Sequence, residues 1–488
     1  MNRKFITNLA LVLLLNLLVK PFWIFGIEVS VQNAVGAENY GFYFSLFGFS
    51  VMLNILLDIG ITNYNNRNIA QNHQLISKYV SSLIVLKFIL ALVYFTIAII
   101  AAMAIGWGWH EIKFLLILLF NQFLSSFVLY LRSNISGLQF FRTDSIISVL
   151  DRTLMIIICG VLLWGNVTDT PFQIEWFVYA QTLAYLLAAL TAFFVVLSKT
   201  EFLKLNYDRT FFIAILKKSF PFALLILLMS FYYRIDSVMI ERLLPDDPDA
   251  VLYGKVQAGI YAQGFRILDA ASNFALLFGA LLLPMFAKMI KQKESIQKLL
   301  KLSYSLIIVP ALAGAIACLF YSYEIMDLLY LEHVNASSKI FSLLIIGFIS
   351  ISTTYIFGTL LTANGSLKHL NIMAASGMAI NIILNFILIP MHGAYGSAIA
   401  SLITQALTAL AQVIIAVGIF KLKINYRYLL LLFIYIGGII GLGFIVTENI
   451  QDWRIGIALM IFISMIIAFG IRLISLKALY QIIKYDKD

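Results

Sequence analysis

Charged residues are scarce in this sequence. Only 12% of its 488 residues are Asp, Glu, Lys or Arg, whereas soluble globular domains contain about 25%. Hydrophobic residues instead reach 62%, above the roughly 45–50% that is usual for soluble domains. This composition excludes a soluble enzyme, a disordered protein and a fibrous repeat. A polytopic membrane protein is the remaining class.

Cysteine, histidine and enzyme motifs are equally sparse. Cys159 and Cys318 both lie in apolar runs, which excludes a disulfide scaffold and is typical of small buried side chains. The five histidines are scattered over the loops without the spacing of metal ligands. Neither a phosphate-binding glycine loop nor a nucleophile elbow is present. We therefore expect no catalytic site, no metal site, no cofactor and no ATP-driven transport.

Long apolar runs dominate what is present. A helix needs about 20 apolar residues to cross the hydrocarbon core of a bilayer. This window predicts fourteen spans, near residues 5–27, 41–62, 79–104, 114–133, 146–164, 174–197, 214–240, 259–287, 302–321, 340–363, 370–389, 396–420, 429–447 and 455–474.

The charges test this count, because cytoplasmic loops collect Lys and Arg. With the N-terminus inside, 24 of the 34 basic residues fall in inward-facing segments and five in outward-facing ones. The outward-facing segments carry 14 of the 24 acidic residues. One missing or additional span would destroy this alternation, so we expect fourteen helices with both termini cytoplasmic. The net charge of +10 then requires no nucleic acid partner.

A faint internal repeat indicates two halves. Lys20 and Arg234 occupy similar depths in the first and seventh spans, and Tyr40-Gly41 resembles Gly259-Ile260-Tyr261 in the spans that follow. Transporters built from such parallel repeats bind their substrate between the halves. We expect an all-α fold with two pseudo-symmetric six-helix bundles, residues 1–200 and 201–425. Residues 426–488 would add two transmembrane helices and a cytoplasmic tail.

Charged residues inside the predicted spans are the candidate functional residues. Each costs at least about 2.5–3.5 kcal/mol at a helix centre, so it is normally paired or lines a polar cavity. Arg234 and Arg266 lie in the outward halves of adjacent spans, and Asp236 and Asp269 accompany them. The arginines could form a cationic cavity for a pyrophosphate, since the guanidinium binds phosphate bidentately. The alternative is a structural salt-bridge cluster that joins the two helices.

The arguments for five further charged residues are weaker. Lys20, just before Pro21, could mirror Arg234 or extend to the lipid headgroups, and Lys87 favours a position in the cavity. Asp151-Arg152 lies near the end of its predicted span, which favours an interfacial position. For Asp58, a helix cap or a partner of Arg67 is favoured over a proton relay.

Several motifs resemble the Wzx-type polysaccharide flippases of the multidrug/oligosaccharidyl-lipid/polysaccharide (MOP) exporter superfamily. The similarity covers nearly the whole chain. The motifs are Ala37-Glu38-Asn39-Tyr40-Gly41, Leu57-Asp58-Ile59-Gly60-Ile61, Arg67 with Ala70, Arg234-Ile235-Asp236-Ser237-Val238-Met239-Ile240, Gly259-Ile260-Tyr261-Ala262, Pro284, Ala363-Asn364-Gly365, Asn381, Asn385, Pro390, Gly393 and Gly396.

This resemblance implies a flippase in the bacterial inner membrane. It would move undecaprenyl-pyrophosphate-linked oligosaccharide units to the outer leaflet for polysaccharide biosynthesis, by alternating access coupled to a proton or sodium gradient. The implied partners are the lipid-linked glycan, membrane lipid and the polysaccharide polymerase machinery. We assign its cationic lumen to Arg234 and Arg266, with Lys20, Lys87 and Arg152 as further cations. Asp236, Asp269 and Asp58 are the candidates for ion coupling or charge balance.

Two other functions compete with the flippase. An ion-coupled drug or metabolite extruder of the same superfamily would share the fold. Five cations against four acids within the spans favour an anionic cargo over the cationic drugs that such exporters commonly carry. A membrane-embedded glycan polymerase would need catalytic acids in a large outer loop, and the first outer loop offers only Glu28 and Glu38.

Overall fold

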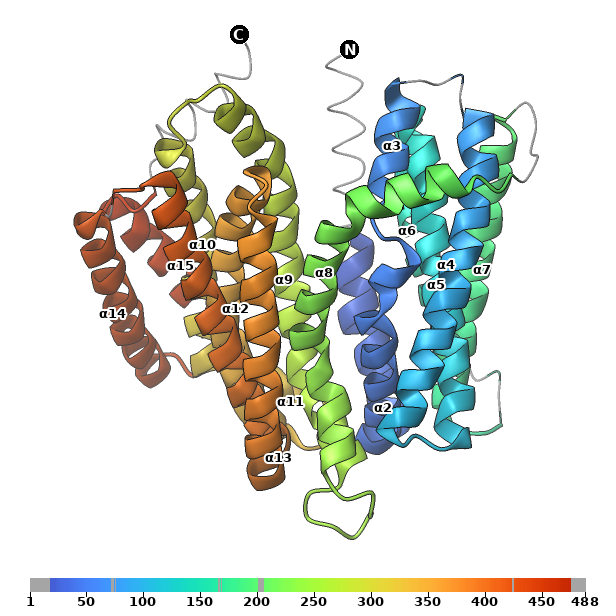
Figure 1. The fold of residues 1–488 in the computed structure, drawn as a ribbon. Coiled ribbons are helices and arrows are strands. Elements are labelled where there is room, and N and C mark those ends of the chain that lie inside the picture. The colour runs from blue at the N-terminus through green and yellow to red at the C-terminus, as the bar shows by residue number, and fades with distance from the viewer. Residues whose placement is uncertain are drawn as a thin grey trace. The chain divides into compact units, whose positions relative to one another are not determined.

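The computed structural model of the chain describes residues 18–71, 74, 76–165, 167, 169–200, 206–423 and 425–474. Every regular element among them is a helix (Figure 1). The helices are η1 (Phe22–Glu28), α2 (Val29–Met52), η2 (Asn54–Leu57), α3 (Ile61–Gln71), α4 (Ile76–Ile105), α5 (Trp109–Gly137), α6 (Phe141–Trp164), α7 (Ile174–Leu197), α8 (Arg209–Leu243), α9 (Gly254–Lys291), α10 (Gln297–Phe320), α11 (Ser322–Leu329), α12 (Val334–Ala363), α13 (Leu367–Phe420), α14 (Tyr426–Asn449) and α15 (Trp453–Gly470).

Two glycines reverse the chain inside elements that are otherwise continuous helix. Gly36 (φ 79°, ψ 167°) and Gly393 (φ 59°, ψ −139°) adopt conformations that favour glycine. The rings of Trp23 and Tyr43 both contact Phe177, at 5.8 and 5.3 Å. In a straight helix these two residues would be about 30 Å apart. The segments on either side of Gly36 therefore form a hairpin.

The number of spans follows from these reversals. Eleven described helices are long and apolar enough to cross a membrane, and the bent pair Leu18–Met52 with Asn54–Ala70 adds a twelfth. Because Gly36 and Gly393 each divide one of them, the described residues hold fourteen membrane-length segments. This confirms the predicted fold class. The part of the first predicted span before residue 18 lies outside the described residues.

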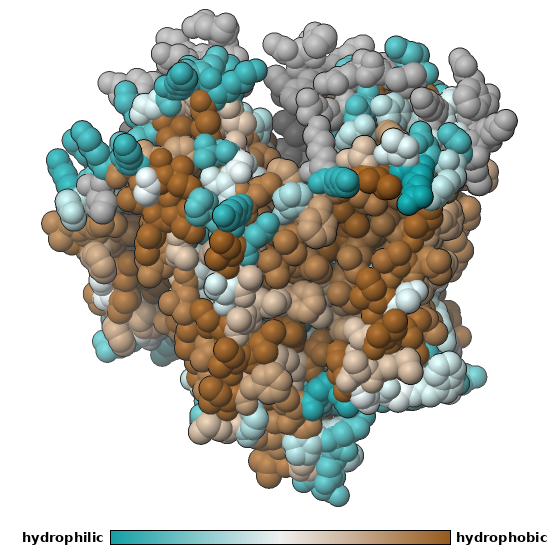
Figure 2. Space-filling model, in the orientation of Figure 1, coloured by the Kyte–Doolittle hydropathy of each residue, from teal (hydrophilic) through white to brown (hydrophobic). Residues whose placement is uncertain are grey.

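The chain forms two compact units, residues 1–259 and 260–488. In the first unit α5 packs against α2, α3 and α7, and α8 packs along α2. Figure 2 shows hydrophobic side chains over the middle of the visible helices, with hydrophilic ones gathered toward the helix ends. This distribution suits helices that cross a bilayer, because apolar side chains are stable against lipid tails.

In the second unit, α12 lies side by side with α13 and also contacts α10 (Figure 1). The last two helices, α14 and α15, pack against α10. Tyr435 and Met460 are fully buried in this contact, and the Tyr428 hydroxyl accepts a hydrogen bond from Ser305 at 2.9 Å. The predicted division at residues 200 and 425 stays a prediction, and its tail after residue 474 lies outside the described residues.

Local boundaries differ from the sequence prediction in several places. The predicted span 41–62 is broken, because α2 ends at Met52 and α3 begins at Ile61. Helix α6 begins at Phe141, five residues earlier than predicted, because its polar first turn extends an apolar helix. The helix continues through Pro21 (φ −61°, ψ −41°), and the π-helical turn η1 follows it directly.

Candidate functional site

The break in the second span is the first part of the candidate site. Beyond Met52 the chain forms one 3-10 turn, and then Ile59 (φ 41°) and Gly60 (φ 81°) take left-handed conformations. The two helical pieces meet at an angle of 47°. Such breaks free backbone carbonyls and expose a helix N-terminus inside the membrane, which transporters use for binding. The motif Leu57-Asp58-Ile59-Gly60-Ile61 thus encodes a discontinuous helix.

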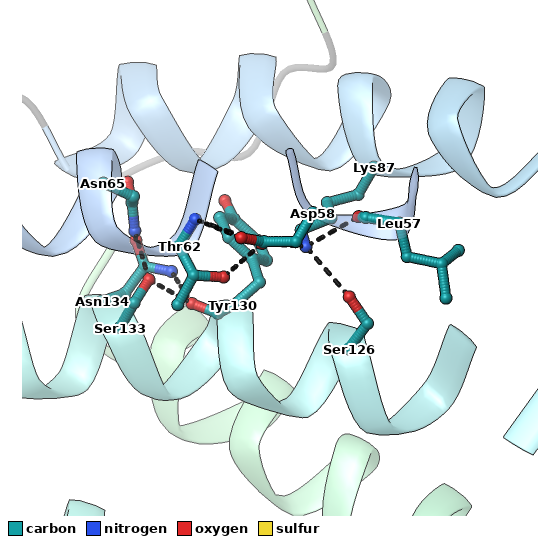
Figure 3. A network of polar contacts seen from close by, with 9 residues as sticks. All are labelled: Leu57, Asp58, Thr62, Asn65, Lys87, Ser126, Tyr130, Ser133 and Asn134. Carbon is teal, nitrogen blue, oxygen red and sulfur yellow. Dashed lines mark hydrogen bonds and ion pairs between the residues drawn. The ribbon is translucent and has the colours of Figure 1, made fainter. Parts of the chain in front are cut away.

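An ion pair fills this break (Figure 3). The ammonium of Lys87, on α4, lies 2.7 Å from Asp58 Oδ1. It also donates to the Leu57 carbonyl at 3.0 Å and to Ser126 Oγ on α5 at 3.1 Å. These three bonds use all three donors of an ammonium group. Lys87 is only 1% exposed, so it can be charged there because its neighbours replace the lost water.

Asp58 also caps the helix that follows the break. Its carboxylate accepts hydrogen bonds from the backbone N–H and the hydroxyl of Thr62, at the start of α3. The predicted capping role of Asp58 is therefore confirmed. Its ion pair is formed with Lys87 on another helix, whereas the sequence suggested Arg67. One turn further along α3, Asn65 donates to Ser133 Oγ at 2.8 Å and to Asn134 Oδ1 at 3.0 Å, which ties α3 to α5 (Figure 3).

The second part of the site surrounds Arg152 near the middle of α6. The guanidinium carbon lies 5.3 Å from the centre of the Trp23 ring and 5.9 Å from that of Tyr185. Both rings are buried, at 3% and 8% exposure. A carboxylate oxygen of Asp151 is 3.7 Å away, beyond hydrogen-bond distance. The interfacial position that the sequence favoured for Arg152 does not describe this arrangement of a guanidinium between two aromatic rings.

Lys20 belongs to the same cluster. It lies on the turn before η1 and interacts electrostatically with both Arg152 and Asp151. Glu28, at the other end of η1, accepts a hydrogen bond from the Trp23 indole at 3.1 Å and acts electrostatically on Arg152. We call Lys20, Trp23, Glu28, Asp151 and Arg152 the Arg152 cluster. It combines two cations, two carboxylates and an aromatic ring on membrane-length helices.

The remaining predicted residues of the first unit lie on α8. Asp236 is 1% exposed, whereas Arg234 is half-buried with its guanidinium carbon 5.4 Å from the ring of Tyr233. Helix α8 is close to α2 here, because Gly48 contacts the carbonyl of Arg234 and the hydroxyl of Ser237. Neither Arg234 nor Asp236 belongs to the Arg152 cluster or to the Lys87 pair.

Arg266 and Asp269 lie on α9 in the second unit. Arg266 is 6% exposed and donates to the hydroxyl of Tyr330 at 3.2 Å. Asp269 follows one turn later and is half-buried. The cavity and the salt-bridge cluster predicted around Arg234 and Arg266 stay predictions.

Sequence reasoning missed several residues that complete these sites. Trp23 and Glu28 were assigned to a span end and an outer loop, and Ser126 and Thr62 were not considered. Glu241, which is 5% exposed and bonded to Trp107, lies one residue beyond the predicted span. Only a search for polar residues at the ends of apolar runs would have pointed to them. Among the described residues, no three His, Cys, Asp or Glu side chains are placed to hold a metal ion.

Known proteins share this architecture. The structure is similar to that of the lipid II flippase MurJ in an inward closed conformation, with a TM-score of 0.72 and 14% identity over 94% of this chain and 98% of that one. An inward-facing multidrug resistance MATE family transporter of the MOP superfamily gives 0.63 at 14% identity, over 85% and 98%. A MOP superfamily transporter from Pyrococcus furiosus gives 0.54 at 15% identity, over 85% and 94%. No curated protein sequence matches the chain.

The fold is therefore that of flippases and transporters rather than of an enzyme class, and the chain is a multi-pass membrane protein. The sequence model of one family, described as polysaccharide biosynthesis protein, matches residues 6–290, more than half of the chain. This region includes the broken second span, the Lys87–Asp58 pair and the Arg152 cluster. The chain belongs to the polysaccharide biosynthesis protein family and has the fold of the MOP superfamily.

Proposed function

We propose that this protein is a flippase for undecaprenyl-pyrophosphate-linked oligosaccharide units. It would move them from the cytoplasmic to the outer leaflet of the bacterial inner membrane, by alternating access and with both termini cytoplasmic. Membership of a polysaccharide biosynthesis family and a fold similar to that of a lipid II flippase support this class of cargo. The polymerase machinery would then consume the unit on the outer side.

The observation that carries the proposal is the Arg152 guanidinium near the middle of a membrane-length helix, beside the buried rings of Trp23 and Tyr185, with the exposed Lys20 acting electrostatically on the same cluster. Cations inside a membrane need negative charge nearby. Asp151 and Glu28 supply it here, and the pyrophosphate of the cargo would compete with them for Arg152. Trp23 and Tyr185 lie beside the guanidinium and the Tyr185 hydroxyl is hydrogen-bonded to it, so the remaining N–H donors of the five on a guanidinium are those that could bind phosphate oxygens. Aromatic rings beside it can also pack against sugar rings.

The other predicted cations take different parts in this proposal. Lys87 has its charge balanced by Asp58, so it would keep the broken helix in place rather than bind cargo. Arg234 and Arg266 stay proposed as a second cationic position for the pyrophosphate. Asp236 and Asp269 stay the candidates for coupling to a proton or sodium gradient.

The isoprenoid tail can remain in lipid during transfer, whereas the pyrophosphate and sugars cannot cross about 30 Å of hydrocarbon unaided. Arginine donors at the pyrophosphate, and amide side chains at the sugars, would replace the lost hydration. Gln181, which is 4% exposed and donates to Tyr43 at 3.0 Å, is one such amide near the Arg152 cluster.

The first test is deletion of the gene, followed by mass spectrometry of lipid extracts and an assay of surface polysaccharide. We expect one undecaprenyl-pyrophosphate glycan to accumulate and the matching polymer to disappear. An unchanged pool of lipid-linked glycan, together with altered sensitivity to cationic compounds, would refute the flippase and favour the drug extruder.

Variants in the deletion strain then test the Arg152 cluster. Arg152→Gln and Lys20→Gln should each fail to restore the polymer at normal protein abundance. Arg454→Gln is the matched control, because Arg454 is exposed on α15 in the second unit with its guanidinium carbon 5.6 Å from the centre of the Trp453 ring. Full activity of the Arg152→Gln/Lys20→Gln double variant would refute the cluster as an anion site. Arg234→Ala and Arg266→Ala test the second position in the same way.

A further inference from the structure

A buried carboxylate that the proposed mechanism does not use lies at the end of α8. Glu241 is 5% exposed, and its Oε2 accepts a hydrogen bond from the indole N–H of Trp107 at 3.1 Å. Its Oε1 lies 3.7 Å from the Arg242 guanidinium, which is too far for a hydrogen bond. A buried carboxylate normally has stronger compensation than one neutral donor and one distant cation. This position therefore suits a group that gains and loses a proton.

The partners of Glu241 connect it to other elements of the first unit. Trp107 belongs to the α4–α5 connection, and its ring packs edge-on against Phe49 of α2 at 4.9 Å. The Arg242 guanidinium donates to the carbonyl of Gly106 in the same connection at 3.2 Å. Trp107 and Arg242 thus fasten the end of α8 to the α4–α5 connection.

The same end of α8, with the start of α9, makes an unusually close contact with α2. A Cβ atom at Gly41 would overlap the carbonyl of Lys255, and one at Gly259 would overlap the carbonyl of Ala37. The side-chain amide of Gln32 donates to the Gly259 carbonyl at 2.9 Å. We call this region the α2–α8–α9 contact. Helices packed this tightly must separate as a body if a path between them is to open.

We propose that Glu241 is a proton-binding site that controls the α2–α8–α9 contact. This inference rests on the proposed function: in the proposed orientation this end of α8 faces outside, where cargo leaves and where protons of an inward gradient enter. Protonation removes the negative charge that attracts Arg242 and weakens the bond from Trp107. Helix α8 is then released from the α4–α5 connection, and the contact can open outward.

The neighbouring ionisable groups are engaged in pairs of their own. Lys255 lies 2.9 Å from Asp246, and both act electrostatically on Glu241. The hydroxyl of Tyr253 donates to Glu38 at 2.9 Å. Burial, together with this hydrogen bond, raises the pKa of Tyr253 to about 12, so its phenol keeps its proton at physiological pH. Glu38, Asp246 and Asp236, which precedes the reporter position Ser237 on α8, are therefore the carboxylates whose effects have to be separated from that of Glu241.

Cysteine labelling from outside can follow the contact without any cargo. In a protein with Cys159→Ala and Cys318→Ala, Ser237→Cys places a thiol at a site that is 3% exposed against Gly48. Val251→Cys, at 96% exposure in the α8–α9 connection, provides the reference. The ratio of the two labelling rates with a membrane-impermeant thiol reagent removes the intrinsic pH dependence of the reagent.

We expect this ratio to rise as the outside pH falls from 7.5 to 5.5. Glu241→Gln should raise it about fivefold at pH 7.5, the difference between a hydrogen bond to a charged acceptor and one to a neutral acceptor, and abolish its pH response. Trp107→Phe keeps the ring against Phe49 and should raise the ratio while leaving a pH response. Asp246→Asn and Glu38→Gln should respond to pH as the parent does.

A Glu241→Gln protein with the parent's ratio and pH response would overturn the proposal. Loss of the response in Asp246→Asn or Glu38→Gln, with Glu241→Gln unaffected, would overturn it as well. The measurement needs no lipid-linked glycan, so its failure is distinct from failure of the flippase assay. Labelling of Val251→Cys from outside tests the proposed orientation separately.

Discussion

Replacing Lys87 by methionine should destabilise the first unit strongly. The substitution shortens the side chain by only one atom but removes the positive charge, and leaves the Asp58 carboxylate without its partner 2.7 Å away. Breaking a buried ion pair on one side typically costs about 3–5 kcal/mol. Because Asp58 is 24% exposed and keeps its bonds to Thr62, we expect the lower end, about 3 kcal/mol.

The double variant Lys87→Met/Asp58→Asn separates the charge effect from a packing effect. It removes both charges, and asparagine still caps the start of α3. Replacing both members of a buried pair is often close to neutral. The double variant should therefore regain at least about 2 kcal/mol relative to Lys87→Met. Adding the cost of Asp58→Asn alone to this gain gives the size of the coupling energy of the pair.

Thermal unfolding in detergent, followed by size-exclusion chromatography, measures this difference. At about 2–4 °C per kcal/mol for a unit of roughly this size, Lys87→Met should lower the Tm by about 6–12 °C. Lys255→Met is the matched control, because its partner Asp246 is 59% exposed and such pairs contribute about 0–1 kcal/mol. Additive effects of Lys87→Met and Asp58→Asn would refute the reasoning, since independent residues show no coupling.

Two backbone predictions follow from the glycines. Gly393→Ala should lower the stability of the second unit by about 1–3 kcal/mol, because a side chain is strained at φ 59°, ψ −139°. Gly418→Ala, which meets nothing within 4 Å, should leave the same Tm unchanged or higher. Gly259→Ala should increase labelling of the α2–α8–α9 contact, since its Cβ would overlap the Ala37 carbonyl. Gly314→Ala should not increase this labelling, because nothing lies within 4 Å of a Cβ atom there. Equal labelling in the two variants would contradict the close approach of Gly259 to the Ala37 carbonyl.

The fourteen-helix architecture could be predicted from the sequence because crossing a bilayer is a local property. Each span needs only enough consecutive apolar residues, and each reversal needs a short polar turn or a glycine. Gly36 and Gly393 both fall between predicted spans, so the two continuous helical elements α2 and α13 were still counted correctly. The family was also recognisable, since its motifs are short and contiguous.

The partners of charged residues could not be predicted in this way. Asp58 was assigned to nearby Arg67, but the break in the second span turns its carboxylate toward Lys87 on α4. Arg152 was placed near an interface because the predicted span began too late, and the structure surrounds it with two rings from η1 and α7. These contacts depend on how helices that are distant in the chain pack together.

Hydropathy and charge alone thus determined that this protein crosses a membrane many times and which residues are costly to place inside it. The tertiary structure decided how that cost is offset. Lys87 is neutralised by a carboxylate, Arg152 is held between aromatic rings, and Glu241 is buried with a single close donor. The physical reason is range: insertion energy adds up along the chain, whereas electrostatic compensation acts over a few ångströms between helices that only folding brings together.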